Sequence, residues 1–213
     1  MSEAGGGEGT ERAALRGDLQ LVADLIDPRA RVLDVGCGDG ALLHYLESHK
    51  GVDARGVEIS DVGVRTCVSN GLSVIQGNAD TDLSDYPSNA FDYVILTQTL
   101  QTVHRPKTVL QQLMRIGDRA IVSFANFGYW RVRAYLMTRG RMPTTKAFGQ
   151  PWYETANIHV CTFRDFEALC RMLGIAIRRR IAVDHQGRAD AFPAVGPLAN
   201  VFGEFGIFLL EKR

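Results

Sequence analysis

A glycine-rich turn, Gly36-Cys37-Gly38-Asp39-Gly40, follows a short apolar run and precedes a helical pattern. Glycines let backbone N–H groups approach a ligand closely, because no Cβ atom stands in the way. Two classes of nucleotide cofactor use such a turn. The dinucleotide fingerprint Gly-x-Gly-x-x-Gly tolerates alanine at its third glycine, which is where Ala41 stands. The glycines alone therefore do not separate the two classes.

Two carboxylates, Asp34 and Asp39, indicate which cofactor the turn binds. Asp34 precedes Gly36 near the end of the predicted strand, where it would repel a pyrophosphate and attract an ammonium group. Asp39 adds a second negative charge, although it could instead cap the following helix. S-adenosylmethionine (SAM) carries an ammonium and a sulfonium. We therefore predict a site for SAM or S-adenosylhomocysteine (SAH), formed by Asp34, Gly36, Cys37, Gly38 and Asp39.

An acidic residue, Glu58, stands at the end of the second predicted strand, followed by Ile59. A carboxylate in this position accepts hydrogen bonds from both ribose hydroxyls in dinucleotide folds. The alternative is an exposed carboxylate at a strand end. We include Glu58 and Ile59 in the predicted cofactor site.

Polar residues also follow the third and fourth predicted strands. Asn78, Ala79 and Asp80 stand at the carboxyl edge of the sheet, where open α/β sheets bind ligands. Asn78 or Asp80 could read the adenine amino group, although such turns are also common for backbone reasons alone. Thr97 occupies the same edge after the fourth strand. These four residues complete the predicted cofactor site.

No residue is assigned to catalysis. His104 and His159 lie near the predicted cofactor edge and could act as general bases, but each is more often a structural residue. The Asp/Asn-Pro-Pro-Tyr/Phe motif of many amino-group methyltransferases is absent after the fourth strand. Because SAM is already activated, a methyltransferase needs little side-chain chemistry. The four cysteines have no metal-ligand spacing, so we expect reduced thiols and no metal site.

Strand and helix patterns alternate through the first part of the chain. This order predicts an α/β fold similar to class I methyltransferases, with a mainly parallel seven-stranded sheet and helices on both faces. The predicted strands cover residues 31–35, 53–59, 72–76, 91–96 and 120–124, and the predicted helices cover residues 19–26, 41–46, 61–69 and 106–116.

The last third departs from this alternation. Thr162 and Asp165 resemble a capping box at the start of a helix that ends near Leu173. Two strand-like runs, residues 175–183 and 206–210, close the chain with no helical pattern of length between them. We expect them to pair antiparallel at one edge of the sheet.

An insertion at about residues 127–157 separates the fifth strand from that helix. Its residues 127–153 are rich in aromatic and basic side chains and contain no acidic residue. The segment is too long for a routine connection. It could be a partner surface, because Trp, Tyr and Arg are enriched in binding hot spots, a lid over a small substrate, or a grip for single-stranded nucleic acid. We favour the partner surface.

The overall composition is that of a globular protein. The chain has 213 residues, 46% hydrophobic and 23% charged, with a formal net charge of zero. That balance argues against a nucleic-acid partner, and the longest apolar runs are too short for a membrane span. We expect a disordered tail over residues 1–14 and one domain over residues 15–213. The lack of a secretory pattern predicts a cytoplasmic location.

The motifs together carry a family resemblance. Their order and spacing resemble class I SAM-dependent methyltransferases over about residues 15–125. More narrowly, the chain resembles the MetW family of methionine biosynthesis proteins from Leu15 to Leu210, on motifs that include Gly56-Val57-Glu58-Ile59, Thr97-Gln98-Thr99-Leu100-Gln101, Ser123-Phe124-Ala125-Asn126-Phe127 and Thr155-Ala156-Asn157-Ile158-His159.

The resemblance implies a function that the pocket alone does not. MetW proteins are associated with MetX-type homoserine O-acyltransferases, so we expect such a partner, contacted through residues 127–153. The chain would then be a SAM-binding accessory protein in methionine biosynthesis, and a SAM pocket would suit end-product sensing. The alternative is an autonomous SAM-dependent small-molecule methyltransferase. The sequence does not distinguish a homo-oligomer from a hetero-oligomer.

Overall fold

The computed structural model describes residues 15–144, 150–184, 188–189 and 197–212. The predicted tail over residues 1–14 lies outside them, as do Lys146 and Phe148 of the insertion. None of the helices in the described part of the chain has both the length and the apolar character needed to span a bilayer.

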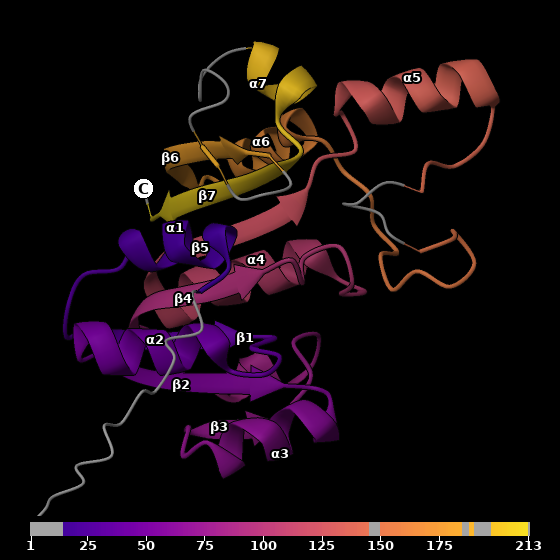
Figure 1. Ribbon diagram of the computed structural model, residues 1–213. Coiled ribbons are helices and arrows are strands. Elements are labelled where there is room, and N and C mark those ends of the chain that lie inside the picture. The colour runs from indigo at the N-terminus through magenta and orange to yellow at the C-terminus, as the bar shows by residue number, and fades with distance from the viewer. Residues whose placement is uncertain (1–14, 145–149, 185–187, 190–196, 213) are drawn as a thin grey trace, which may run out of the picture.

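Seven strands within the described residues form one sheet, in the order β3-β2-β1-β4-β5-β7-β6 (Figure 1). Neighbours from β3 to β5 pair parallel, whereas β7 pairs antiparallel with both β5 and β6. The predicted mainly parallel sheet and the antiparallel closing pair are therefore confirmed. The strands are β1 (Arg31–Val35), β2 (Asp53–Glu58), β3 (Val74–Gln76), β4 (Phe91–Thr97), β5 (Gly117–Ala125), β6 (Ala176–Val183) and β7 (Phe205–Glu211).

The sequence patterns did not predict three helical elements: the 3-10 turn η1 after β3, α5 inside the insertion and the short α7 between the last two strands. The predicted capping box at the start of α6 is confirmed: Asp165 N–H donates to Thr162 Oγ1 at 3.3 Å, and Thr162 N–H to the Asp165 carboxylate at 3.0 Å. The helices are α1 (Gly17–Asp24), α2 (Ala41–Lys50), α3 (Asp61–Ser69), the 3-10 turn η1 (Asp82–Asp85), α4 (Pro106–Ile116), α5 (Trp130–Arg139), α6 (Phe163–Met172) and α7 (Pro197–Phe202).

Helices cover both faces of the sheet, and the side chains along each strand alternate between the two faces. In β4, Tyr93 and Ile95 join a buried cluster with α1, α2 and α3, whereas Val94 and Leu96 join a cluster with α4, α6 and α7. Strands buried on both faces are typical of parallel α/β sheets. This packing fixes the strand ends that carry the predicted site.

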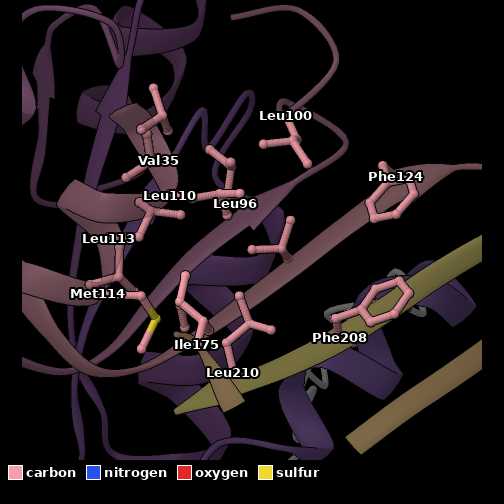
Figure 2. Close-up of a cluster of buried hydrophobic side chains, with 14 of the residues drawn as sticks. Val35, Leu96, Leu100, Leu110, Leu113, Met114, Phe124, Ile175, Phe208 and Leu210 are labelled. Carbon is pink, nitrogen blue, oxygen red and sulfur yellow. The ribbon is translucent and has the colours of Figure 1, made fainter. Parts of the chain in front are cut away.

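Figure 2 shows part of the second cluster, where Leu110, Leu113 and Met114 of α4 lie among side chains of the sheet. Phe124 of β5 and Phe208 of β7 belong to the same cluster. Their rings stack in parallel with centroids 5.4 Å apart. Stacked aromatic pairs add about 0.5–1.5 kcal/mol to the free energy of area burial. The antiparallel strand β7 is thereby held firmly against the parallel part of the sheet.

The strand order reverses between β1 and β4. From β1 the chain continues to β2 and β3 on one side, and then returns to build β4 and β5 on the other side. Open α/β sheets bind ligands at such a switch point, outside the carboxyl ends of the strands. The glycine-rich turn after β1 and the loop after β4 meet at this point.

Candidate functional site

The glycine-rich turn connects β1 to α2 in a backbone conformation that suits glycine. Gly36, Gly38 and Gly40 have φ angles of 77°, 59° and 80°, in the left-handed region that side chains with a Cβ atom disfavour. A Cβ atom on Gly36 would also lie 2.5 Å from the Thr99 hydroxyl oxygen of the loop after β4. Glycine therefore lets the turn and this loop touch.

Asp34 lies inside the sheet, paired with Gly56 of β2 and Ile95 of β4. Its exposed fraction is 1%, and its Oδ1 atom has no hydrogen-bond partner among the described residues. Burial raises the pKa of the Asp34 carboxyl to about 7, and the negative charge of Glu58 adds to the shift. An unpaired buried acceptor costs roughly 1–3 kcal/mol. A bound cation that donates hydrogen bonds would remove this cost.

Glu58 is buried at the end of β2, and both of its carboxylate oxygens accept backbone hydrogen bonds. One oxygen accepts from Gly38 N–H at 2.9 Å and the other from Ser60 N–H at 2.9 Å. The carboxylate thus ties the glycine-rich turn to the start of α3. A carboxylate has about four acceptor positions, so two positions remain for ribose hydroxyls.

Asp80, in the turn after β3, stabilises a neighbouring loop, a role that the sequence did not predict. Its two carboxylate oxygens accept from the backbone N–H groups of His104 and Arg105, each at 2.8 Å. Asp80 therefore holds the loop that leads into α4. Asn78 Oδ1 accepts from Asp80 N–H at 2.9 Å, which is the backbone explanation for such residues in turns. Both roles are compatible with a ligand contact at the turn.

A pocket of about 140 Å³ opens between these elements. It is lined by Gly36, Ile59, Asn78, Ala79 and Asp80 of the predicted site. The loop after β4 supplies further lining residues, Thr99, Thr102, Val103 and His104. Whole-ligand pockets usually measure about 300–1,000 Å³. The pocket therefore suits one part of a ligand, such as a planar ring, with the rest lying along the glycine-rich turn.

Six residues of the predicted site do not line this pocket: Asp34, Cys37, Gly38, Asp39, Glu58 and Thr97. The Cys37 side chain is buried in the core beside α2, where burial raises the pKa of its thiol. Exposed Asp39 accepts from Ala41 N–H at 3.1 Å at the start of α2, so its alternative as a helix cap is present in the structure. Thr97 accepts, through its carbonyl, from the Thr99 hydroxyl at 2.9 Å.

Known proteins resemble the chain at two levels. A family model for "Methionine biosynthesis protein MetW" matches residues 16–210. The chain belongs to the MetW family. It is 31% identical over 176 residues to the bifunctional methionine biosynthesis protein MetXA/MetW of Rhodopirellula baltica, and the match covers 78% of this chain. The MetW-family chain spans 28% of that relative's length.

Solved structures agree on the fold. A SAM-dependent methyltransferase from Thermotoga maritima matches with a TM-score of 0.65 and 18% identity, covering 92% of this chain and 88% of that one. The [4+2]-cyclase SpnF matches with a TM-score of 0.64 and 18% identity, covering 91% and 80%. This MetW-family chain therefore has the class I SAM methyltransferase-like fold. Because a cyclase shares that fold, the fold alone does not fix the reaction.

Proposed function

We propose that this chain is a SAM- or SAH-binding accessory protein that supports a MetX-type homoserine O-acyltransferase in methionine biosynthesis. The observation that carries the proposal is the Rhodopirellula baltica relative, a bifunctional protein that joins MetXA and MetW. Joining two modules in one chain holds each at a high effective concentration near the other. Such a joint chain is expected where the two modules act together. We extend that association to the present chain.

The residues around the glycine-rich turn fit SAM or SAH. The unpaired Asp34 oxygen suits the ligand's ammonium group, because it is a buried acceptor without a donor among the described residues. The remaining acceptor positions of Glu58 suit the ribose hydroxyls, and the pocket beside Asn78 and Ala79 suits the adenine ring. SAM would supply an activated methyl group there.

A regulatory use of this pocket follows from the pathway. SAM is made from methionine, and homoserine acylation is the committed step toward methionine. Occupancy of the pocket would therefore report the supply of the end product to the acyltransferase. This use needs binding and a response of the partner, but no methyl transfer.

The acylation rate of the acyltransferase tests the proposal. The rate is measured with and without this chain, each in the presence and absence of SAM. We expect the rate to depend on the chain, and to change further when SAM is added. If none of the four conditions differs, the accessory role is wrong. If the rate depends on the chain but not on SAM, the accessory role holds and the sensing role is wrong.

A second candidate, an autonomous small-molecule methyltransferase, is favoured by one observation. His104, a candidate general base, lines the pocket beside Asp80. Conversion of SAM to SAH by the purified chain, dependent on an added acceptor and lost in His104→Ala, would support this candidate. The accessory role predicts no acceptor-dependent conversion.

A further inference from the structure

Helix α5 stands apart from the helices that cover the sheet, beyond the carboxyl end of β5 (Figure 1). Of its ten residues only Val132 is buried. Val132 packs in a small cluster with Ala125, Phe127, Leu136 and Phe205. Isolated helices of this length are marginal in water, so most of their stability must come from packing. A helix held by so little of its own domain is well placed to pack against another molecule.

The insertion also exposes large apolar and aromatic side chains. The exposed fractions are 44% for Trp130, 84% for Met137, 70% for Trp152 and 68% for Tyr153. Single exposed apolar residues are ordinary, but several in one segment indicate an interaction site. Trp, Tyr and Met are enriched in protein interfaces, and Trp and Tyr in their hot spots.

A groove of about 270 Å³ lies within this segment. Its apolar lining comes from Phe127, Met142, Trp152, Ile158 and Val160, and it is distinct from the cofactor pocket. A concave apolar site of this size receives a side chain rather than a flat surface. Hot-spot residues typically fill such desolvated pockets at the centre of an interface.

The charge of the insertion indicates the chemistry of its partner. Arg131, Arg139 and Arg141 are exposed and form no ion pair with any residue that the structure describes. The sequence has no acidic residue from Phe127 to Tyr153, and Glu154 is the one acidic residue in the rest of the insertion. A second copy of this chain would bring arginines against arginines in a two-fold contact, which is unfavourable. An acidic surface would match them.

We infer that the groove and the three arginines form a docking surface for an acidic face of the acyltransferase, with one apolar side chain of that face inserted in the groove. This inference rests on the proposed function and adds where and how the partner binds. The aromatic side chains would surround the inserted residue and exclude water, as in other hot-spot regions.

Affinity between this chain and its acyltransferase tests the inference. Arg131→Glu, Arg139→Glu and Arg141→Glu together should raise the Kd at least about 100-fold, because three attractions become repulsions. The matched control reverses three arginines outside the surface, Arg29, Arg164 and Arg171, which are also exposed and form no side-chain ion pair with a described residue. Their reversal should change the Kd less than about threefold.

A second pair of variants tests the groove. Ile158→Asp should raise the Kd about 30-fold or more, because it places a charge where an apolar side chain would bind. Ile75→Asp on β3 is the control, since Ile75 has a similar exposed fraction, 57% against 50%. Circular dichroism and SAH affinity, unchanged in all variants, would show that the fold is intact.

The outcomes separate this inference from the proposed function. If the unaltered chain does not bind the acyltransferase, both are wrong. If it binds and the docking variants bind as well as their controls, only the docking surface is wrong. The docking inference also fails if the arginines instead mediate self-association in sedimentation, or if a single-stranded oligonucleotide displaces the acyltransferase.

Discussion

The proposed cofactor pocket and the insertion lie at the same edge of the sheet but are built in opposite ways. The proposed site combines the glycine-rich turn and its pocket with two buried carboxylates that lie next to the turn, Asp34 and Glu58. The insertion presents exposed aromatic and basic side chains, and its helix α5 buries one residue. Buried, preorganised groups suit a small ligand of fixed shape. Exposed Trp, Tyr and Arg suit a macromolecular surface.

This difference predicts that substitutions in the two regions affect the binding of different ligands. A change in the pocket should weaken the small ligand and leave the partner bound, whereas a change in the insertion should do the reverse. A methyltransferase with a substrate lid would not show this separation, because a lid that closes over the pocket would also affect binding of the small ligand. The following predictions are ordered from the largest effect to the smallest.

The largest effect is expected from removing two indole side chains. Trp130→Ala with Trp152→Ala should weaken acyltransferase binding by about 10³-fold, because hot-spot truncations cost about 2 kcal/mol or more each. SAH affinity should stay the same. Titration calorimetry with each ligand measures both. Val68→Ala with Met172→Ala, also exposed apolar residues, is the control and should change neither affinity. A joint loss of SAH binding would favour the lid.

The second prediction concerns the proposed cofactor site, where Glu58→Ala should weaken SAH binding. It removes charge-assisted hydrogen bonds, each worth about 1.5–3 kcal/mol, so SAH affinity should fall about 10- to 100-fold. The backbone bonds to Gly38 and Ser60 are lost as well, so thermal unfolding is followed alongside. Glu154→Ala, an exposed glutamate of the insertion, is the matched control. Unchanged SAH affinity in Glu58→Ala would remove this residue from the site.

The pocket could be predicted from the sequence where its residues follow strands directly. Glycines and carboxylates after β1 and β2 carry their chemistry in their types and positions, so the turn and Glu58 were accessible to sequence reasoning. The bracing role of Asp80 was not, because its partners lie 24 and 25 residues away in the chain. Thr102 and Val103 line the pocket through the path of an irregular loop, which no periodicity encodes.

The composition identified the insertion, but the sequence patterns did not predict the helix α5 within it. Helical periodicity reveals a helix when its apolar residues face one core. In α5 the apolar residues Trp130, Tyr135 and Met137 are exposed while Val132 is buried, so no single apolar stripe appears. α7 has six residues, too few for a periodic pattern. The exposure of these apolar side chains removes the pattern by which a helix is predicted, and it also leaves them accessible to the proposed partner.

Binding of SAH should depend on pH through Asp34. Burial raises the pKa of this carboxyl to about 7, and only the ionised form attracts the ligand's ammonium. Affinity should therefore be highest above pH 7 and fall about tenfold between pH 8 and pH 6 as the carboxyl takes up a proton. Calorimetry across this range measures the slope. Asp34→Asn should bind weakly with a flat profile. A flat profile in the unaltered chain would contradict the role of Asp34.

Among the described residues, the loop between β4 and α4 links the two regions. Thr99, Thr102 and His104 of this loop line the pocket. Between them, Gln101 is 3% exposed, and its carbonyl accepts from Ile158 N–H at 2.9 Å and from His159 N–H at 3.0 Å. Ile158 lines the groove. A ligand that shifts this loop would therefore shift one wall of the docking surface.

The smallest effect is a coupling between the two ligands through this loop. We expect SAH to change acyltransferase affinity about fivefold, and the acyltransferase to change SAH affinity by the same factor, because linkage is reciprocal. His159→Ala removes the contact between the His159 Nε2 atom and the His104 carbonyl at 3.3 Å, and should reduce the factor toward one while both affinities persist.

His49→Ala is the control, because exposed His49 makes a similar contact with the Tyr45 carbonyl, remote from the loop. Equal coupling in both variants would mean that the signal does not pass through His159. No coupling in the unaltered chain would mean that the pocket and the docking surface bind their ligands independently, although both lie at the same edge of the sheet.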